Sequence, residues 1–114
     1  MRRMDLPEPL EVMLHNLREA GEAFARAKAS RLMAEHMRKV VLALEQKTHQ
    51  EGCKSVAAQE REALASERYK QHISDEAKAC FDEEMARTRL KDAEYRLELY
   101  RTESANLRAE RVNT

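Results

Sequence analysis

The sequence predicts an all-α fold, a long antiparallel helical hairpin that is coiled-coil-like and has a short connecting helix. Only two Gly and two Pro occur in 114 residues, so the chain has little material for turns. Charged residues make up 37% of the chain, against about 25% in an average domain. This composition favours long helices. An all-β fold would need a turn about every 8–12 residues and is excluded.

The first predicted helix covers about residues 8–50. Pro7 and Pro9 stand at its start, because proline is tolerated in the first helical turn and not deeper. Apolar residues then recur at spacings of three and four, in two sets separated by a predicted stutter. The two sets are Leu10, Leu14, Leu17, Gly21 and Phe24, and then Met33, Met37, Val40 or Val41, and Leu44.

Three small residues mark the ends of the remaining helices. Gly52 is predicted to end the first helix in a left-handed conformation. Ser55 is predicted to cap a short helix over about 55–65, and Ser66 a third helix over about 67–109. The early face of the third helix is expected to hold Tyr69, Ile73, Ala77, and Cys80 or Phe81. Its late face follows a heptad repeat through Leu90, Ala93, Leu97, Tyr100, Ser104 and Leu107.

Charge is distributed in alternating blocks, although the net charge is zero. Residues 8–22 and 75–84 are acidic, residues 26–39 are basic, and residues 87–101 are net basic. If the chain folds back near residue 56, facing residues have numbers that sum to about 112, and each acidic block then meets a basic one. This register favours an antiparallel hairpin. The same pairing fits an antiparallel dimer with swapped helices.

The chain is expected to form a single helical domain over residues 1–114. A two-helix hairpin has a thin core, and oligomerisation is a usual remedy, so a homo-oligomer is expected. The sequence contains no uncharged apolar run of about 18 residues, which excludes a membrane span. Cys53 and Cys80 are expected to be free thiols in a reducing cytoplasm.

No residue pattern indicates catalysis. His49 and Cys53 are four apart, but no second ligand pair completes a zinc site. A phosphate-binding loop is excluded because there is no Gly-rich run. Cys80 lies beside Phe81, which is typical of a buried core position, and no base accompanies it. We therefore predict no enzyme activity, no cofactor and no metal.

Six residues are candidates for contact with a partner. Five are basic and belong to the 26–39 block, and the sixth is an aromatic residue outside the predicted seam, available for stacking on a nucleic-acid base. They are Arg26, Lys28, Arg31, Arg38, Lys39 and Tyr95. Pairing of the basic block with the acidic block of the third helix is the favoured alternative to nucleic-acid contact.

Two stretches of the sequence resemble a known group of proteins. One is Ala25–Leu44, with its Arg-Ala-Lys-Ala-Ser-Arg-Leu-Met segment and the later His-Met-Arg-Lys. The other is Lys54–Ser66 with Tyr69, continued by Arg96–Glu110. Together they resemble small, uncharacterised helical proteins of tailed bacteriophages and prophages. Relatives often have Pro after the cap serine and Trp near the position of Tyr100, where this chain has Glu67 and Tyr100.

The resemblance implies a role by association, because such genes tend to lie near recombination and replication genes. We expect a non-enzymatic accessory protein in the cytoplasm of a bacterial host, which binds a viral or host replication or recombination protein through its helix faces. One alternative is an oligomeric DNA-binding protein that uses the 26–39 basic block. The other is an inhibitor of a host defence or nuclease complex.

Overall fold

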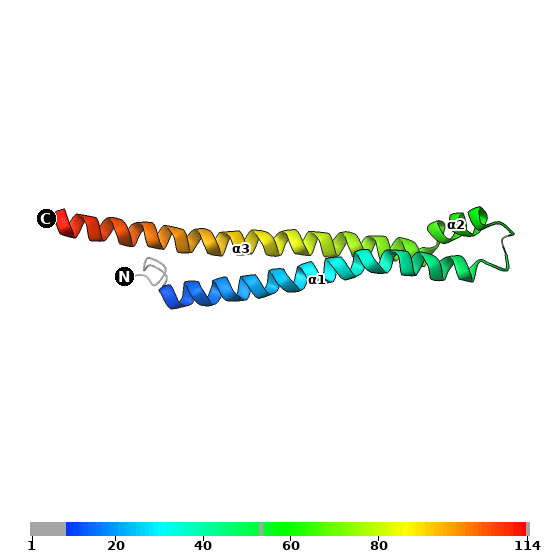
Figure 1. Ribbon diagram of the computed structural model, residues 1–114, viewed down its shortest axis with the longest axis horizontal. Helices are drawn as coiled ribbons and strands as arrows, with labels where there is room; N and C mark the ends of the chain where they lie inside the picture. The colour runs from blue at the N-terminus through cyan, green and yellow to red at the C-terminus, as the bar shows by residue number, and fades with distance from the viewer. Residues whose placement is uncertain (1–8, 53, 114) are drawn as a thin grey trace. The chain divides into compact units, whose positions relative to one another are not determined.

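The computed structural model describes residues 9–52 and 54–113, and these form three helices (Figure 1). They are α1 (Leu10–Thr48), α2 (Val56–Ala65) and α3 (Glu67–Asn113). The fold is an all-α antiparallel helical hairpin with a short connecting helix, which confirms the predicted fold class.

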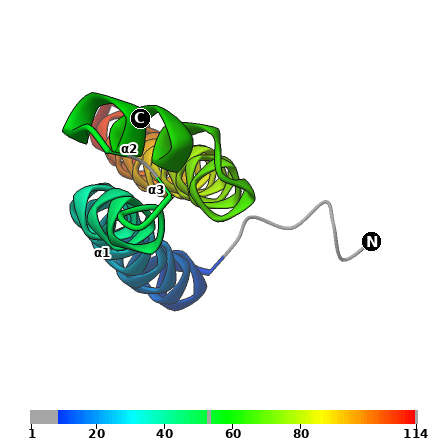
Figure 2. The ribbon, with the colours of Figure 1, turned by 90° about the vertical axis from the view of Figure 1, so that its right-hand side faces the viewer.

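The described residues cluster into two compact units. Unit 1 contains residues 9–25 and 85–113, and unit 2 contains residues 26–84. Each unit holds a segment of α1 and a segment of α3 that run side by side in opposite directions (Figures 1 and 2). Unit 2 also contains α2, which lies beside the last turns of α1 (Figure 1).

The beginning of α1 agrees with the expected role of proline. The Pro9 carbonyl accepts hydrogen bonds from the backbone amides of Val12 at 3.0 Å and Met13 at 3.1 Å. The Pro9 carbonyl thus accepts the first i−4 bond of the helix, from Met13, and also satisfies the Val12 amide of the first turn. Pro7 lies outside the described residues.

The end of α1 differs from the prediction. The helix ends at Thr48, and the His49 amide donates to two carbonyls of the preceding turn, both at 3.2 Å. The Gln50 amide then donates to the Lys47 carbonyl at 3.3 Å, which is a tightened, 3₁₀-type turn. Gly52 does not have a positive φ, so its predicted left-handed cap is wrong. The tightened turn satisfies the last carbonyls without it.

Both predicted serine caps are confirmed. The Ser55 Oγ accepts a hydrogen bond from the Ala58 amide at 3.1 Å. The Ser66 Oγ accepts one from the Tyr69 amide at 3.1 Å and donates one to the Ala63 carbonyl at 2.8 Å. Ser66 therefore ends α2 and begins α3 at a single residue, which explains why no loop separates them.

The inner face of each long helix follows a heptad repeat. On α1 the less exposed residues include Met13, Leu17, Ala20 and Phe24 in unit 1, and Ala27, Arg31, Ala34, Met37, Val41 and Glu45 in unit 2. On α3 they include Tyr69, His72, Glu76, Ala79 and Glu83 in unit 2, and Ala86, Leu90, Ala93, Leu97, Tyr100 and Ser104 in unit 1. Spacings of three and four alternate along α3 and recur along α1, as in a coiled coil.

Alanine occupies alternate positions in the middle of these inner stripes, at residues 20, 27 and 34 of α1 and 79, 86 and 93 of α3. Ala86 and Ala93 on α3 are buried in unit 1, and Ala20 on α1 is partly buried. Small side chains let two helix backbones approach closely, so the larger residues between them can interlock. The stripe of α3 through Leu90, Ala93, Leu97, Tyr100 and Ser104 agrees with its prediction, whereas Leu107 is exposed.

The predicted inner face of α1 is partly wrong. Met13 takes the inner position that was assigned to Leu14, which is exposed. The predicted stutter does not occur, because the heptad repeat continues without interruption through Arg31. Met33 and Leu44, which were expected in the core, are 61% and 43% exposed. The repeat was missed because its unit 2 positions include charged residues and alanine.

The predicted early face of α3 is confirmed at Tyr69 and wrong at its other positions. Ile73, Ala77, Cys80 and Phe81 are exposed, and Phe81 is 63% exposed. The expected burial of Cys80 is therefore incorrect, although Cys80 is a free thiol as predicted. Polar inner residues, such as Glu76, take the positions that an apolar pattern would have supplied. Cys53 lies outside the described residues.

We predict that Ala86→Leu destabilises the protein by about 1–3 kcal/mol, because the larger side chain does not fit the buried position where α1 and α3 approach closely. The same change at the exposed α3 residue Ala105 should alter stability by no more than about 0.5 kcal/mol. Urea unfolding followed by circular dichroism measures both. Equal effects at the two positions would contradict the tight alanine layers.

Candidate partner-binding surfaces

Two of the six candidate contact residues lie in the seam of unit 2. The Arg31 Nε donates to the carboxylate of Glu83, and its Nη1 donates to the Glu35 Oε1 at 2.7 Å. The Arg38 Nε donates to the Glu76 Oε2 at 2.9 Å, and its Nη2 donates to the other oxygen of the same carboxylate. Arg38 thus binds the Glu76 carboxylate in a bidentate arrangement, with two parallel hydrogen bonds, which is the strongest arrangement for this pair of groups.

The carboxylates of these pairs are the buried partners. Glu83 is 3% exposed and Glu76 is 6% exposed, whereas the Arg38 side chain is half exposed. Hydrogen bonding by Arg38 lowers the pKa of Glu76 and outweighs the opposing effect of burial. The same interaction raises the pKa of Arg38, and hydrogen bonding to Glu83 raises the pKa of Arg31. These shifts favour the charged forms of Arg31, Arg38 and Glu76.

The pairs confirm that the basic block of α1 meets the acidic block of α3. The predicted register placed residue 31 opposite about 81 and residue 38 opposite about 74. The observed partners are Glu83 and Glu76, two residues further along α3. At the end of the same seam, the Arg68 Nε lies 3.8 Å from the Glu45 Oε1. Block charges therefore predicted which segments pair, and the observed ion pairs give the register two residues from the predicted one.

The other four candidates are exposed. Arg26, Lys28 and Lys39 lie on the surface of α1 in unit 2. Tyr95 is 62% exposed on α3 and belongs to unit 1. Two of the five basic residues are thus committed to ion pairs within unit 2.

A second heptad stripe runs along the outside of α1 in unit 2. Its residues have the spacing three, four, three, four and are Ser30, Met33, Met37, Val40 and Leu44. We call this set the outer stripe. All of its members are exposed except Met37, which is partly buried. A groove of about 550 Å³ borders Ser30, Met33 and Met37 of the stripe, and its other lining residues are Ala29, Ala34, Val41 and His72. His72 is fixed there by a 2.8 Å hydrogen bond between its Nε2 and the Ala34 carbonyl.

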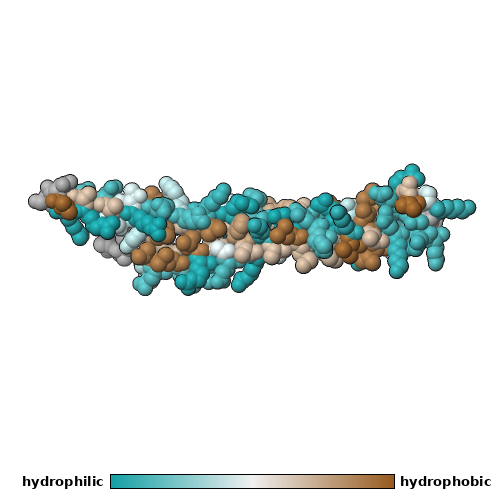
Figure 3. All heavy atoms as spheres, viewed as in Figure 1, coloured by the Kyte–Doolittle hydropathy of each residue, from teal (hydrophilic) through white to brown (hydrophobic). Residues whose placement is uncertain are grey.

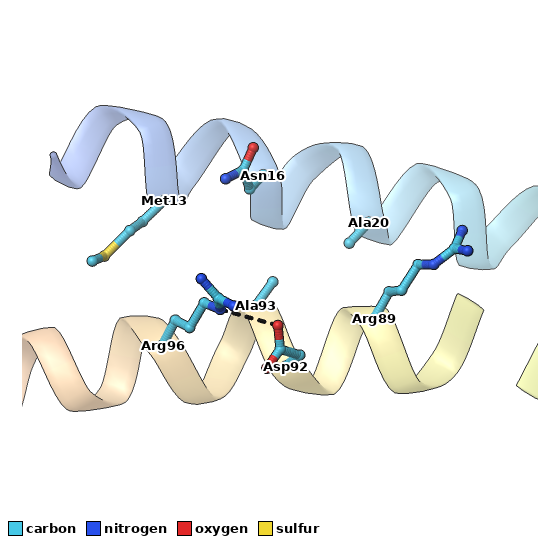
Figure 4. Close-up of a pocket in the computed structure, with 7 residues that line it drawn as sticks. All are labelled: Met13, Asn16, Ala20, Arg89, Asp92, Ala93 and Arg96. Carbon is cyan, nitrogen blue, oxygen red and sulfur yellow. Dashed lines mark hydrogen bonds and ion pairs between the residues drawn. The ribbon is translucent and has the colours of Figure 1, made fainter. Parts of the chain in front are cut away.

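Unit 1 has a groove of its own between α1 and α3 (Figure 4). Its volume is about 210 Å³. Met13, Ala20 and Ala93 supply its apolar lining, and Arg89 and Arg96 lie along its α3 side. We call it the arginine groove. Both arginines belong to the net basic 87–101 block, and neither was predicted as a contact residue, because the groove exists only once α1 and α3 are paired.

The surface view shows that apolar side chains reach solvent in both units (Figure 3). They alternate with hydrophilic side chains on the face that is drawn. Single exposed apolar residues are ordinary, but grouped ones mark interaction sites. The outer stripe and the arginine groove are therefore the two candidate surfaces.

We predict that Arg31→Glu lowers the unfolding midpoint, because it places a second carboxylate beside the buried Glu83. Glu83→Arg alone should also destabilise, and the double swap should recover much of the loss. Lys28→Glu, a charge reversal at an exposed site on α1, is the matched control and should have little effect. Thermal unfolding of the four variants measures this. Additive losses in the double swap would show that residues 31 and 83 do not face each other.

Stability should also depend on Glu76 at acid pH. The folded-state pKa of Glu76 is lowered, so its contribution is present above the unfolded pKa of about 4.3 and is lost as pH falls through the folded value. Glu76→Gln should therefore destabilise at pH 7 and flatten the loss of stability below about pH 4. Urea midpoints from pH 2 to pH 7 test this. A variant that keeps the full acid dependence of the wild type would refute it.

No described helix combines the length and apolar character that a membrane span requires. Among the described residues, no group of three or more His, Cys, Asp or Glu side chains could hold a metal ion. Comparisons with models of protein families, with curated proteins and with solved structures found no match. The surfaces of the chain itself therefore carry the functional inference.

Proposed function

We propose that this chain is a non-enzymatic accessory protein of a tailed bacteriophage or prophage. It acts in the cytoplasm of the bacterial host and binds a viral or host replication or recombination protein through its helix faces. The observation that carries the proposal is the outer stripe of α1, an apolar heptad repeat that no described residue covers fully. The resemblance of the sequence to phage proteins supplies the biological setting.

The outer stripe has the pattern that one helix offers to another. Its residues from Ser30 to Leu44 span about 21 Å along the helix at 1.5 Å per residue. Apolar side chains at spacings of three and four are the anchors of helix-in-groove and coiled-coil recognition. Met33 and Met37 at its centre are flexible and polarisable, so they adapt to a partner surface.

Direct binding of DNA by the 26–39 block has less support. Arg31 and Arg38 hold the carboxylates of Glu83 and Glu76, so their charges are largely neutralised within unit 2. Each phosphate contact adds to affinity and to its salt dependence. Loss of two of five cations therefore weakens that block as a nucleic-acid surface.

Met33→Glu should abolish capture of the partner protein, because it puts a charge in the middle of the outer stripe. The experiment is a tagged pull-down from phage-infected and uninfected host lysates, treated with nuclease and read by mass spectrometry. We expect a partner that survives nuclease and falls at least about tenfold with Met33→Glu, a loss of about 1.4 kcal/mol in binding. Leu32→Glu, which charges an adjacent exposed apolar residue outside the stripe, should retain it.

Two outcomes would contradict this function. Capture that disappears with nuclease in the wild type would make nucleic acid the ligand. Capture that Met33→Glu leaves unchanged would exclude the outer stripe. Sedimentation velocity on the purified protein separates a second copy of the chain, the expected homo-oligomer, from a different protein as the occupant of the stripe.

A further inference from the structure

The arginine groove of unit 1 combines an apolar floor with a basic wall. Ala20 of α1 and Ala93 of α3 form a low floor, because neither side chain extends beyond Cβ. Met13 closes one end of the floor with a flexible apolar side chain. The small side chains of Ala20 and Ala93, which let the two helices approach closely, thus also leave the space of the arginine groove.

The size of the hollow decides what class of occupant it takes. Sites for drug-sized ligands measure about 300–1,000 Å³ and enclose most of the ligand. The arginine groove is smaller, at about 210 Å³, and lies at the helix surface. A groove of this size suits one or two apolar side chains of a partner and not a whole cofactor.

The charged residues that line the groove indicate what kind of partner segment it binds. Arg89 and Arg96 are one heptad apart on α3, about 10 Å along the helix axis. The Arg96 Nε donates to the Asp92 Oδ2 at 3.0 Å, which orients that side chain beside the groove (Figure 4). Arg89 is exposed and has no ion pair among the described residues. Its guanidinium retains its full hydrogen-bonding capacity for a carboxylate.

Nucleic acid fits this groove less well than protein. The Asp92 carboxylate lies between the two arginines in the sequence and lines the same groove. Its negative charge opposes a phosphate and a carboxylate alike, so the apolar floor is what separates the two kinds of ligand. The apolar floor formed by Ala20 and Ala93 would remain empty under a sugar–phosphate backbone, whereas an apolar side chain would fill it.

We propose that the arginine groove binds an acidic amphipathic helix of a partner protein. An apolar side chain of that helix sits on Ala20 and Ala93, and carboxylates one heptad apart bind Arg89 and Arg96. This surface belongs to unit 1, shares no residue with the outer stripe, and does not depend on the function proposed for that stripe. It adds a second docking site and states the chemistry of the segment that fills it.

The test uses a synthetic helical peptide of about 18 residues as the probe. It carries Leu at spacings of three and four and Glu on both flanks of the Leu stripe, and its fluorescence anisotropy reports binding to the full chain. A second peptide has Gln in place of every flanking Glu. Arg89→Gln and Arg96→Gln should each weaken binding of the acidic peptide about two- to fivefold, and together about tenfold.

Lys91→Gln is the matched control, because it removes one positive charge from an exposed residue of the same helix outside the groove. Its affinity should stay within about twofold of the wild type. Met33→Glu should also leave peptide binding unchanged, which separates this site from the outer stripe. Circular dichroism of each variant confirms that the hairpin is intact.

Four results would overturn the proposal. They are absence of binding, equal binding of the Glu and Gln peptides, equal weakening by Lys91→Gln and Arg89→Gln, and displacement of the peptide by single-stranded DNA at lower concentration than by unlabelled peptide. The last would identify nucleic acid as the better ligand of the two arginines.

Discussion

The ion pairs in the seam of unit 2 are the constraint on which the pairing of α1 and α3 depends. Glu76 and Glu83 are buried, and a buried carboxylate that loses its cation is strongly destabilising. A slip of one heptad would place Arg31 opposite Leu90, or Glu83 opposite Phe24. Alanine layers alone would tolerate such a slip, because every layer is alike. The charges therefore select the register that the small residues permit.

The same constraint explains why α1 has two heptad stripes. Positions that face α3 in unit 2 hold alanine, arginine and glutamate, with Val41 as the one large buried aliphatic side chain among the described residues there. The large apolar residues Met33, Val40 and Leu44 lie one step around the helix, at the surface. A helix that pairs internally through charge thus retains an apolar face for another molecule.

Sequence reasoning predicted the features that depend on composition and local chemistry. The scarcity of glycine and proline, the two serine caps and the apolar repeat of Leu90 and Leu97 are all visible along the chain. The facing positions of α1 and α3 in unit 2 were not predicted, because a search for apolar periodicity skips Arg31 and Glu76. The sequence does contain a signal for that seam: opposite charges at the same heptad spacing on both predicted helices. Cys80 and Phe81 were placed inside because they are apolar, although that repeat puts them outside.

In each unit, the residues buried between α1 and α3 determine which residues remain at the surface. Unit 2 buries charge and exposes the outer stripe, whose residues the sequence analysis found but assigned to the core. Unit 1 buries Leu97 next to Ala93 on the inner stripe and leaves Arg89 at the surface beside the groove that Ala20 and Ala93 line. Neither surface can be predicted from one helix alone, since each is defined by which residues the partner helix covers. Charge pairing in unit 2 and alanine packing in unit 1 thus leave one apolar surface and one basic surface, and the two select partner segments of different composition.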